Sequence, residues 1–229
     1  MSISYNGFDI SDVNYNNGAL SSVLYNGTEV WPNVELIDYV FPNATTKLTA
    51  NGDYGIYAYV NAKNSESQDG WYTLDGSTET AWMLHSSIQD YGRMCIVFPF
   101  MVQLQSLKII NKSTLYAGTA ATVNGLETGQ IYVSPNVITG EMMGESIESM
   151  TGAMELYMEI NRKQPTATAS LKGYSTTHSN PDYANTWIRS VGIRGTTWGP
   201  GGTSSWKSIG EIELSFKADS SDLEKYGLA

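Results

Sequence analysis

The sequence predicts an all-β protein built as a β-sandwich, and three observations carry that prediction. The chain is rich in residues that favour strands and turns, with 15 Tyr, 6 Trp and 22 Gly among 229 residues. Short segments in which polar and apolar residues alternate recur between turns rich in glycine and serine. The pattern contains no long amphipathic helix. The length suits one large domain, or a domain of about 150 to 180 residues with extensions.

The first 33 residues contain a short internal repeat. The stretch ISYNGFDI at 3–10 returns as VLYNGTEV at 23–30. Each copy carries Asn-Gly between apolar flanks, which is the strongest short-range signal for a β-hairpin. Hairpins of this size are marginal alone. We therefore expect residues 1–33 to form a hairpin arm that packs on the main domain or on another subunit.

Residues 34–217 are expected to form the sandwich, and residues 218–229 a charged tail that is either a short helix or frayed. In MELYMEI, at 154–160, the apolar residues alternate with Glu155, Tyr157 and Glu159, which predicts a strand with one buried and one wet face. A helical stripe of methionines over 143–158 is the alternative. The expected strands are TKLTA, MCIVFPF, LQSLKIIN, GQIYVS, MELYMEI, TATASLKGY, WIRSVGIRG and IGEIELSF.

Charge excludes one class of partner. Lys and Arg total 13 against 23 acidic residues, a net charge of −10 without a basic cluster, so we expect no binding to nucleic acid. The first ten residues lack the basic and apolar regions of a signal peptide. No apolar stretch approaches the length that spans a bilayer, about 18 to 20 residues. We therefore expect cytoplasmic synthesis, no membrane insertion, and a buried, unreactive Cys95 in an apolar strand.

The segment LDGSTETAW at 74–82 is the most informative motif. An Asp-Gly turn is followed at fixed spacing by Thr80 and Trp82. This arrangement resembles the hallmark of the coagulation factor 5/8 type C (discoidin-like) domains, which are galactose-binding-like jelly rolls and include many bacterial carbohydrate-binding modules. The segments RMCIVFPFMVQLQSLKIIN, IYVSPN, WIRSVGIRG and IGEIELSF resemble later strands of that family in the same order. The resemblance implies a jelly-roll β-sandwich.

The resemblance also implies a structural calcium ion in the Asp-Gly loop. Asp75 would supply a carboxylate, Thr80 a hydroxyl or carbonyl, and Glu211 of the closing strand a second carboxylate. Two departures stand out, because Ser77 replaces the family's second aspartate and Pro99 replaces an aspartate after the first paired strand. The alternative is an Asx turn in which Asp75 caps its own backbone.

Binding residues are expected on loops at one end of the sandwich, where aromatic rings and histidines would hold a sugar. Trp198, in the Gly- and Pro-rich TTWGPGG, is the strongest candidate because a loop offers little to bury an indole. Each of these residues has an ordinary loop or core role as its alternative. The candidates are Trp71, Tyr72, His85, Tyr91, Tyr116, His178 and Trp198.

The sequence shows no catalytic motif, so we expect a non-catalytic module that recognises glycans on a cell surface. The Tyr-Asn-Gly repeats look like the attachment segments of phage tail proteins. This predicts a tail or receptor-binding protein of a virion, with other virion subunits as partners and a homo-oligomeric state. The alternative is a purely structural tail protein that binds no sugar.

Overall fold

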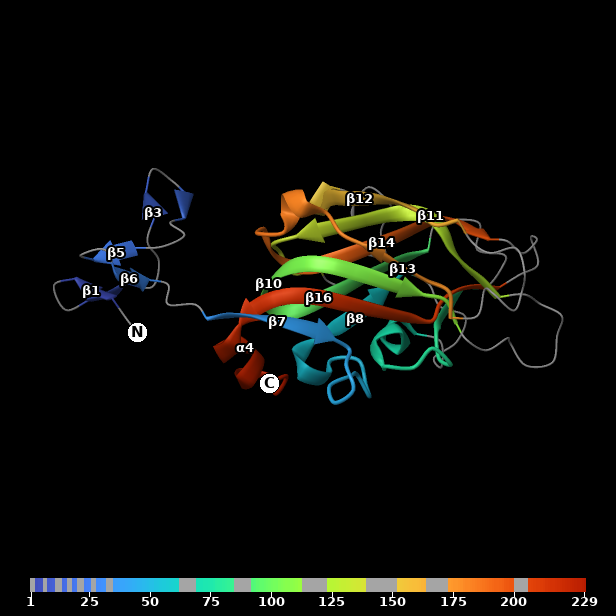
Figure 1. Cartoon of the computed structure of the whole chain (residues 1–229), viewed down its shortest axis with the longest axis horizontal. Helices are drawn as coiled ribbons and strands as arrows, with labels where there is room; N and C mark the ends of the chain where they lie inside the picture. The colour runs from blue at the N-terminus through green and yellow to red at the C-terminus, as the bar shows by residue number, and fades with distance from the viewer. Residues whose placement is uncertain are drawn as a thin grey trace.

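The computed structural model describes residues 35–61, 69–84, 92–112, 123–138, 152–163, 173–199 and 206–229, and the backbone of six short strands between residues 3 and 31 (Figure 1). Ten described strands form one connected network of β-pairing. They are β7 (Leu36–Phe41), β8 (Tyr57–Val60), β9 (Trp82–Leu84), β10 (Arg93–Ile110), β11 (Val123–Ser134), β12 (Glu155–Asn161), β13 (Ser175–His178), β14 (Trp187–Gly199), β15 (Trp206–Ile209) and β16 (Glu211–Asp219).

The N-terminal strands confirm the hairpin prediction and add a third hairpin. β1 (Ile3–Tyr5) pairs with β2 (Phe8–Ile10), and β5 (Val23–Tyr25) pairs with β6 (Thr28–Trp31). Between them β3 (Asn14–Tyr15) pairs with β4 (Gly18–Ala19). The intervening VNYNNGAL is thus a further copy of the Tyr-Asn-Gly repeat, with one asparagine inserted.

The long strand β10 organises the sandwich. Its first half lies between β14 and β8, and its second half lies between β16 and β13. The path then runs from β14 to β11 and β12 on one side, and from β16 to β7 on the other (Figure 1). The segments MCIVFPF and LQSLKIIN, expected as two strands, are therefore one strand.

An irregularity interrupts the β10–β14 register between Val97 and Val102. Pro99 lies there, and proline offers no N–H to a neighbouring strand. Arg189 from β14 donates instead to the carbonyl oxygens of Phe98 and Pro99, at 3.3 and 2.9 Å. The irregularity therefore keeps its backbone acceptors satisfied.

The strand prediction for 154–160 is confirmed by β12. Ile160 is buried and Glu159 is exposed, as predicted, but the predicted faces of Leu156 and Tyr157 are wrong. Tyr157 is 2% exposed, whereas Leu156 is 43% exposed. A bulge in the β11–β12 register, between Ile131 and Tyr132, places an extra residue opposite β11 and breaks the alternation at Leu156 and Tyr157. The Tyr157 hydroxyl is satisfied inside, because it accepts from the Asn180 N–H at 2.7 Å. The methionines from 143 to 150 lie outside the described residues.

Two other segments differ from expectation. TKLTA is an irregular loop, in which the side chain of Asn43 accepts hydrogen bonds from the N–H groups of Thr45 and Thr46. The stretch TATASLKGY lies mostly outside the described residues. Short 3-10 helices occur at η1 (Asp53–Gly55), η3 (Gly70–Leu74) and η4 (Pro181–Tyr183).

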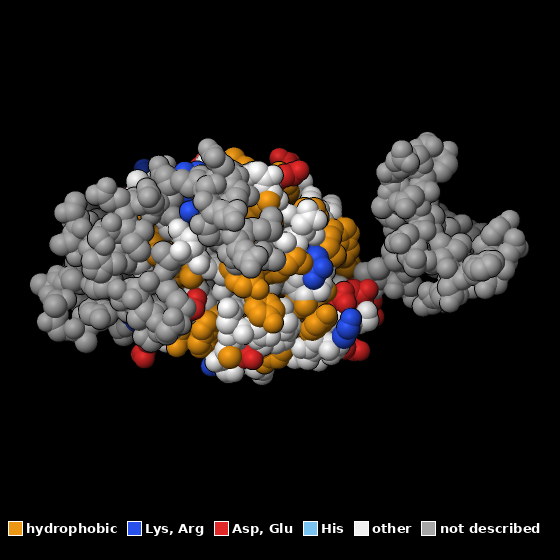
Figure 2. All heavy atoms as spheres, turned by 180° about the vertical axis from the view of Figure 1, so that it is seen from behind, with side chains coloured by type: hydrophobic (Ala, Val, Ile, Leu, Met, Phe, Trp, Pro, Cys, Tyr) orange, Lys and Arg blue, Asp and Glu red, His pale blue; other side chains and the backbone are white. Residues whose placement is uncertain are grey.

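The C-terminal tail is a helix, α4 (Ser220–Lys225), which Asp219 caps by accepting from the Ser221 N–H at 2.9 Å. Leu223 and Leu228 are buried in the main core. Among the described helices none is long and apolar enough to cross a membrane. On the face shown in Figure 2, apolar patches lie between scattered charges in the part of the chain that the structure describes.

Candidate functional site

The Asp-Gly loop between η3 and β9 is held by its own side chains. Gly76 has a φ of +72°, a conformation that favours glycine. The Asp75 Oδ1 accepts from the Ser77 N–H at 2.9 Å, which makes an Asx turn. Thr80 Oγ1 lies 2.6 Å from Asp75 Oδ2 and 2.9 Å from the Ser77 carbonyl oxygen. Trp82 follows at the start of β9 and is 1% exposed, so it anchors the loop to the core.

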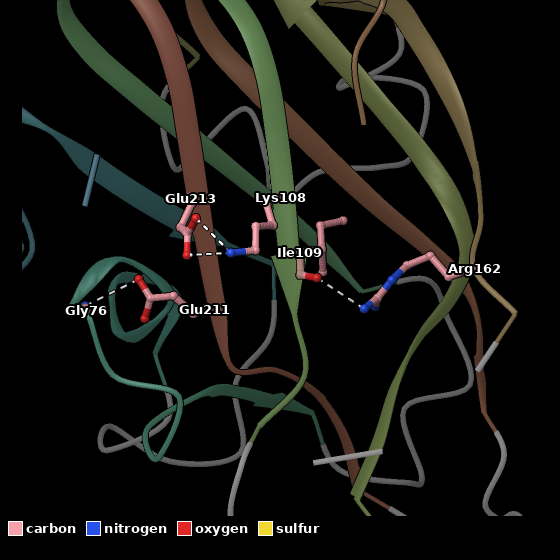
Figure 3. A network of polar contacts seen from close by, with 6 residues as sticks. All are labelled: Gly76, Lys108, Ile109, Arg162, Glu211 and Glu213. Atoms are coloured by element: carbon pink, nitrogen blue, oxygen red, sulfur yellow. Dashed lines mark hydrogen bonds and ion pairs between the residues drawn. The ribbon is translucent and has the colours of Figure 1, made fainter. Parts of the chain in front are cut away.

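Glu211, the first residue of β16, reaches this loop from the far end of the sequence. Its carboxylate Oε1 accepts from the Gly76 N–H at 3.3 Å (Figure 3). Its Oε2 is buried without a hydrogen-bond partner. Burial, and then the charge of Asp75, raise the pKa of Glu211 to about 9. The structure therefore brings Asp75, Thr80 and Glu211 to one place.

The chemistry of these groups fits a hard cation. Calcium takes six to eight oxygen ligands, and the loop gathers two carboxylates with a hydroxyl and a carbonyl oxygen. The unpartnered Glu211 Oε2 is the observation that fits best, because a buried carboxylate oxygen needs a donor or a cation. Among the described residues no group of three or more His, Cys, Asp or Glu is placed to hold a metal. Carbonyl and hydroxyl oxygens would have to complete the ligand set.

A surface depression of about 300 Å³ borders the loop. Lys47, Gly76 and Glu211 line it, together with Glu213. Glu213 forms an ion pair with Lys108 of β10 at 3.0 Å (Figure 3). Lys47 is not predictable from the sequence, because nothing in the spacing from 47 to 76 brings the two segments together. The contact depends on the hydrogen bond from the Leu48 N–H to the Leu74 carbonyl oxygen, at 2.9 Å.

Among the predicted sugar-binding residues, the aromatic ones that the structure describes are Trp71, Tyr72 and Trp198. Trp71 and Tyr72 lie on η3 with their rings stacked, 3.9 Å between centroids, and both are partly exposed. Trp71 also packs against the core.

The loop placement predicted for Trp198 is wrong, since it lies on β14 opposite Leu126. Its partly buried ring meets Trp82 edge to face, 6.1 Å between centroids. Small neighbours allow this packing, because a Cβ on Gly195 would lie 2.3 Å from the indole. The paired strand buries part of the ring, which the loop prediction did not anticipate, and Gly195 leaves room for it.

His178 differs most from its prediction, because it is buried at the end of β13 and not on a loop. Its Nε2 lies 3.0 Å from Thr176 Oγ1, and burial, followed by the nearby Arg162 charge, lowers its pKa. His85, Tyr91 and Tyr116 lie outside the described residues. The described part of the chain therefore places His178 in a different cluster from the Asp75 loop.

Arg162 forms the centre of that second cluster, and nothing in the sequence pattern predicts its role. Its side chain donates to the carbonyl oxygen of Ile109 at 3.2 Å (Figure 3). It also donates to the carbonyl oxygens of Leu126 and Tyr174 at 2.8 and 3.2 Å. Burial lowers its pKa to about 10. These contacts tie β10 and β11 to the segment before β13, which makes Arg162 a structural residue.

Comparison with known proteins supports the fold. No family model and no curated protein matches this chain. The family 32 carbohydrate-binding module of C. perfringens NanJ, solved with galactose, is 12% identical with a TM-score of 0.52, and the match covers 78% of this chain and 99% of that one. An F5/8 type C domain from Bacteroides fragilis is also 12% identical, with a TM-score of 0.46 over 70% and 90% of the two chains.

A fucolectin from striped bass (Morone saxatilis) serum matches 76% of this chain and 50% of its own, with 12% identity and a TM-score of 0.47. The match to the C. perfringens module confirms the predicted jelly-roll β-sandwich. At this identity the likeness establishes the fold alone.

Proposed function

We propose that this protein is a non-catalytic carbohydrate-binding module that recognises glycans on a cell surface. The observation that carries the proposal is the jelly-roll fold, which the C. perfringens module uses to bind galactose. The partly exposed rings of Trp71, Tyr72 and Trp198 support it, because aromatic faces pack against the C–H groups of sugars. The undescribed residues His85, Tyr91 and Tyr116 remain candidate contacts.

The environments of the reactive side chains favour binding over catalysis. Burial raises the pKa of Cys95 to about 12, so its thiol stays protonated and inert. Glu211, whose pKa is strongly raised, is only 3% exposed and faces the Asp-Gly loop. A substrate would not reach the Cys95 thiol, and Glu211, although it lines the surface depression, is held by the Asp-Gly loop.

We also propose that the Asp-Gly loop holds a structural calcium ion. Asp75 and Glu211 would supply carboxylate oxygens, and Thr80 and the Ser77 carbonyl neutral ones. The bound ion would supply the positive charge that the buried carboxylates lack. It would fix the loop in front of Trp82. Calcium that binds only the folded state raises the melting temperature. An unchanged melting temperature in excess calcium and in chelator would contradict this part of the proposal.

For the biological setting we propose a phage tail or other virion assembly, reached after cytoplasmic synthesis. The three N-terminal hairpins favour it, since such small hairpins gain stability by packing on other subunits. A shallow sugar site gives a Kd of about 0.1 to 1 mM. Several copies in a homo-oligomeric tail would raise the avidity through effective concentration. The same hairpins fit the second candidate, a tail scaffold that binds no sugar.

A glycan array probed with a multimerised sample separates the two candidates. We expect binding to at least one microbial surface glycan. Replacing the partly exposed Tyr72 with Ala, or His85 with Ala, should then weaken binding at an unchanged melting temperature. Trp198→Ala is a poor test, because the ring also packs against the core. Absence of binding across the array would favour the scaffold.

A further inference from the structure

Lys47 lies across the Asp-Gly loop. A Cβ added to Gly76 would lie 2.9 Å from Lys47 Cδ and 3.9 Å from its Nζ. Glycine at position 76 thus allows the positive φ of the turn, and its lack of a side chain also leaves room for the side chain of Lys47. The backbone next to Lys47 is fixed by the hydrogen bond from Leu48 to Leu74. The ammonium group is therefore delivered to the loop by a defined segment, although the side chain itself is exposed.

Two lysine side chains carry positive charge close to the carboxyl group of Asp75. Burial raises the pKa of Asp75, while hydrogen bonds from Thr80 and Ser77 and the charge of Lys47 act in the opposite direction. A second ammonium group, on Lys112, is half-buried and attracted to Glu79 and Asp75. Glu211 faces the same depression as Lys47. Without a bound ion, the positive charges of Lys47 and Lys112 therefore face the carboxyl groups of this loop.

We propose that Lys47 is a built-in competitor of calcium at the Asp75–Glu211 loop. The ammonium and a calcium ion would be attracted by the same carboxylate and would repel each other. The flexible lysine chain reaches solvent, so it would move aside and weaken binding without blocking it. This inference rests on the calcium part of the proposed function. Competition from Lys47 would make the calcium ion exchangeable. In the ion-free loop the lysine ammonium group would supply positive charge in place of the ion.

Calorimetric titration with calcium chloride tests the proposal in the full chain. Lys47→Met should bind calcium about 3- to 10-fold more tightly than the unchanged protein. Lys47→Arg keeps the charge and should keep the original affinity. Lys217→Met is the matched control, because it removes one lysine six residues farther along β16 from Glu211. It should change the affinity less than about twofold, since salt screens charges that far apart.

Melting temperatures provide an independent readout. In chelator Lys47→Met should melt below the unchanged protein, and its rise with calcium should be larger. Lys47→Gln should give the same result as Lys47→Met. Agreement between the two variants would show that the effect comes from loss of the charge and not from the methionine side chain. Calcium binding by the unchanged protein with equal or weaker binding by both Lys47 variants would overturn the role of Lys47 and leave the calcium site standing. Binding by none of the proteins would overturn both.

Discussion

Glu211 shows how one side chain ties the closing strand to a loop more than a hundred residues away. Its carboxylate is buried when β16 pairs with β10, and one of its oxygens accepts a hydrogen bond from the Gly76 N–H. The other oxygen is buried without a partner. A buried carboxylate in this position prefers its protonated form unless a cation compensates it. The ionisation of Glu211 is therefore sensitive to pH.

Glu211→Gln should flatten the pH dependence of stability in chelator. The folded pKa of about 9 lies above the usual 4.5, so between these values the folded state holds a proton that the unfolded state has lost. The contribution of Glu211 to stability is therefore fully present below pH 4.5 and falls as pH rises toward 9, by at most about 1.4 kcal/mol per pH unit. Urea unfolding of both proteins at pH 5 to 8 measures how the free energy of unfolding changes with pH.

Glu213→Gln is the control for that experiment, since Glu213 lies two residues away but forms a half-exposed ion pair with Lys108. It should not reproduce the effect. Glu211→Gln should also remove the rise in melting temperature with calcium. A pH slope that persists in Glu211→Gln would show that another group carries it.

At the scale of elements, β12 depends on its bulge. The extra residue turns Tyr157 inward, where its hydroxyl accepts from the Asn180 N–H. The Asn180 side chain in turn donates to the Tyr157 carbonyl oxygen at 2.5 Å. This pair of bonds fastens β12 to the turn that precedes β14. The bulge therefore places a polar aromatic inside without leaving its hydroxyl unsatisfied.

Tyr157→Phe should cost about 1 to 2 kcal/mol of the free energy of unfolding, because the partly buried Asn180 N–H loses its acceptor. Tyr183→Phe is the matched control. The Tyr183 hydroxyl donates to the Leu156 carbonyl oxygen at 3.2 Å in an exposed position, so its loss should cost less than about 0.5 kcal/mol. Equal losses in denaturant unfolding would contradict the role assigned to the bulge.

Some elements of this fold can be predicted from the sequence and others cannot. The alternating runs that became β10, β14 and β16 predict their strands, because period-2 patterns report burial on one face. A bulge shifts that period without a residue-type signal, so the pattern misplaces Leu156 and Tyr157 of β12. The Gly- and Pro-rich TTWGPGG predicts a loop at Trp198, but β14 continues to Gly199, and Gly195 makes room for the indole. The contact of Lys47 with Gly76 depends on tertiary packing.

Across the whole molecule, the last twelve residues belong to the sandwich. The Tyr39 hydroxyl of β7 donates to the Leu228 carbonyl oxygen at 2.7 Å, and Leu223 is fully buried. Leu223→Ala should cost about 2 to 4 kcal/mol through lost burial and the cavity left behind. Glu224→Ala, at an exposed position one residue on, should change stability by less than about 0.5 kcal/mol. Chemical denaturation compares them, and equal effects would show that α4 is not part of the core.

Removing residues 1–34 should leave the sandwich intact. The main core cluster runs from Phe41 to Leu228 within the described residues. The shortened chain should therefore melt within about 2 °C of the full protein in differential scanning calorimetry. A fall of ten degrees or more would mean that the arm contributes to the fold of the sandwich.

The pairing of β7 with β16 determines how the protein would respond to mechanical load. β7 follows directly after the arm, and its six residues are paired in antiparallel register from Leu36 opposite Asp219 to Phe41 opposite Leu214. A pull on the N-terminal end of β7 acts along the strand, so the hydrogen bonds with β16 are loaded together in shear. Peeling them one at a time would need a pull across the strand. Forced unfolding follows the unfolding rate and not the equilibrium stability. A load applied through residues 1–34 and resisted at the far end of the sandwich would thus strain this strand pair first.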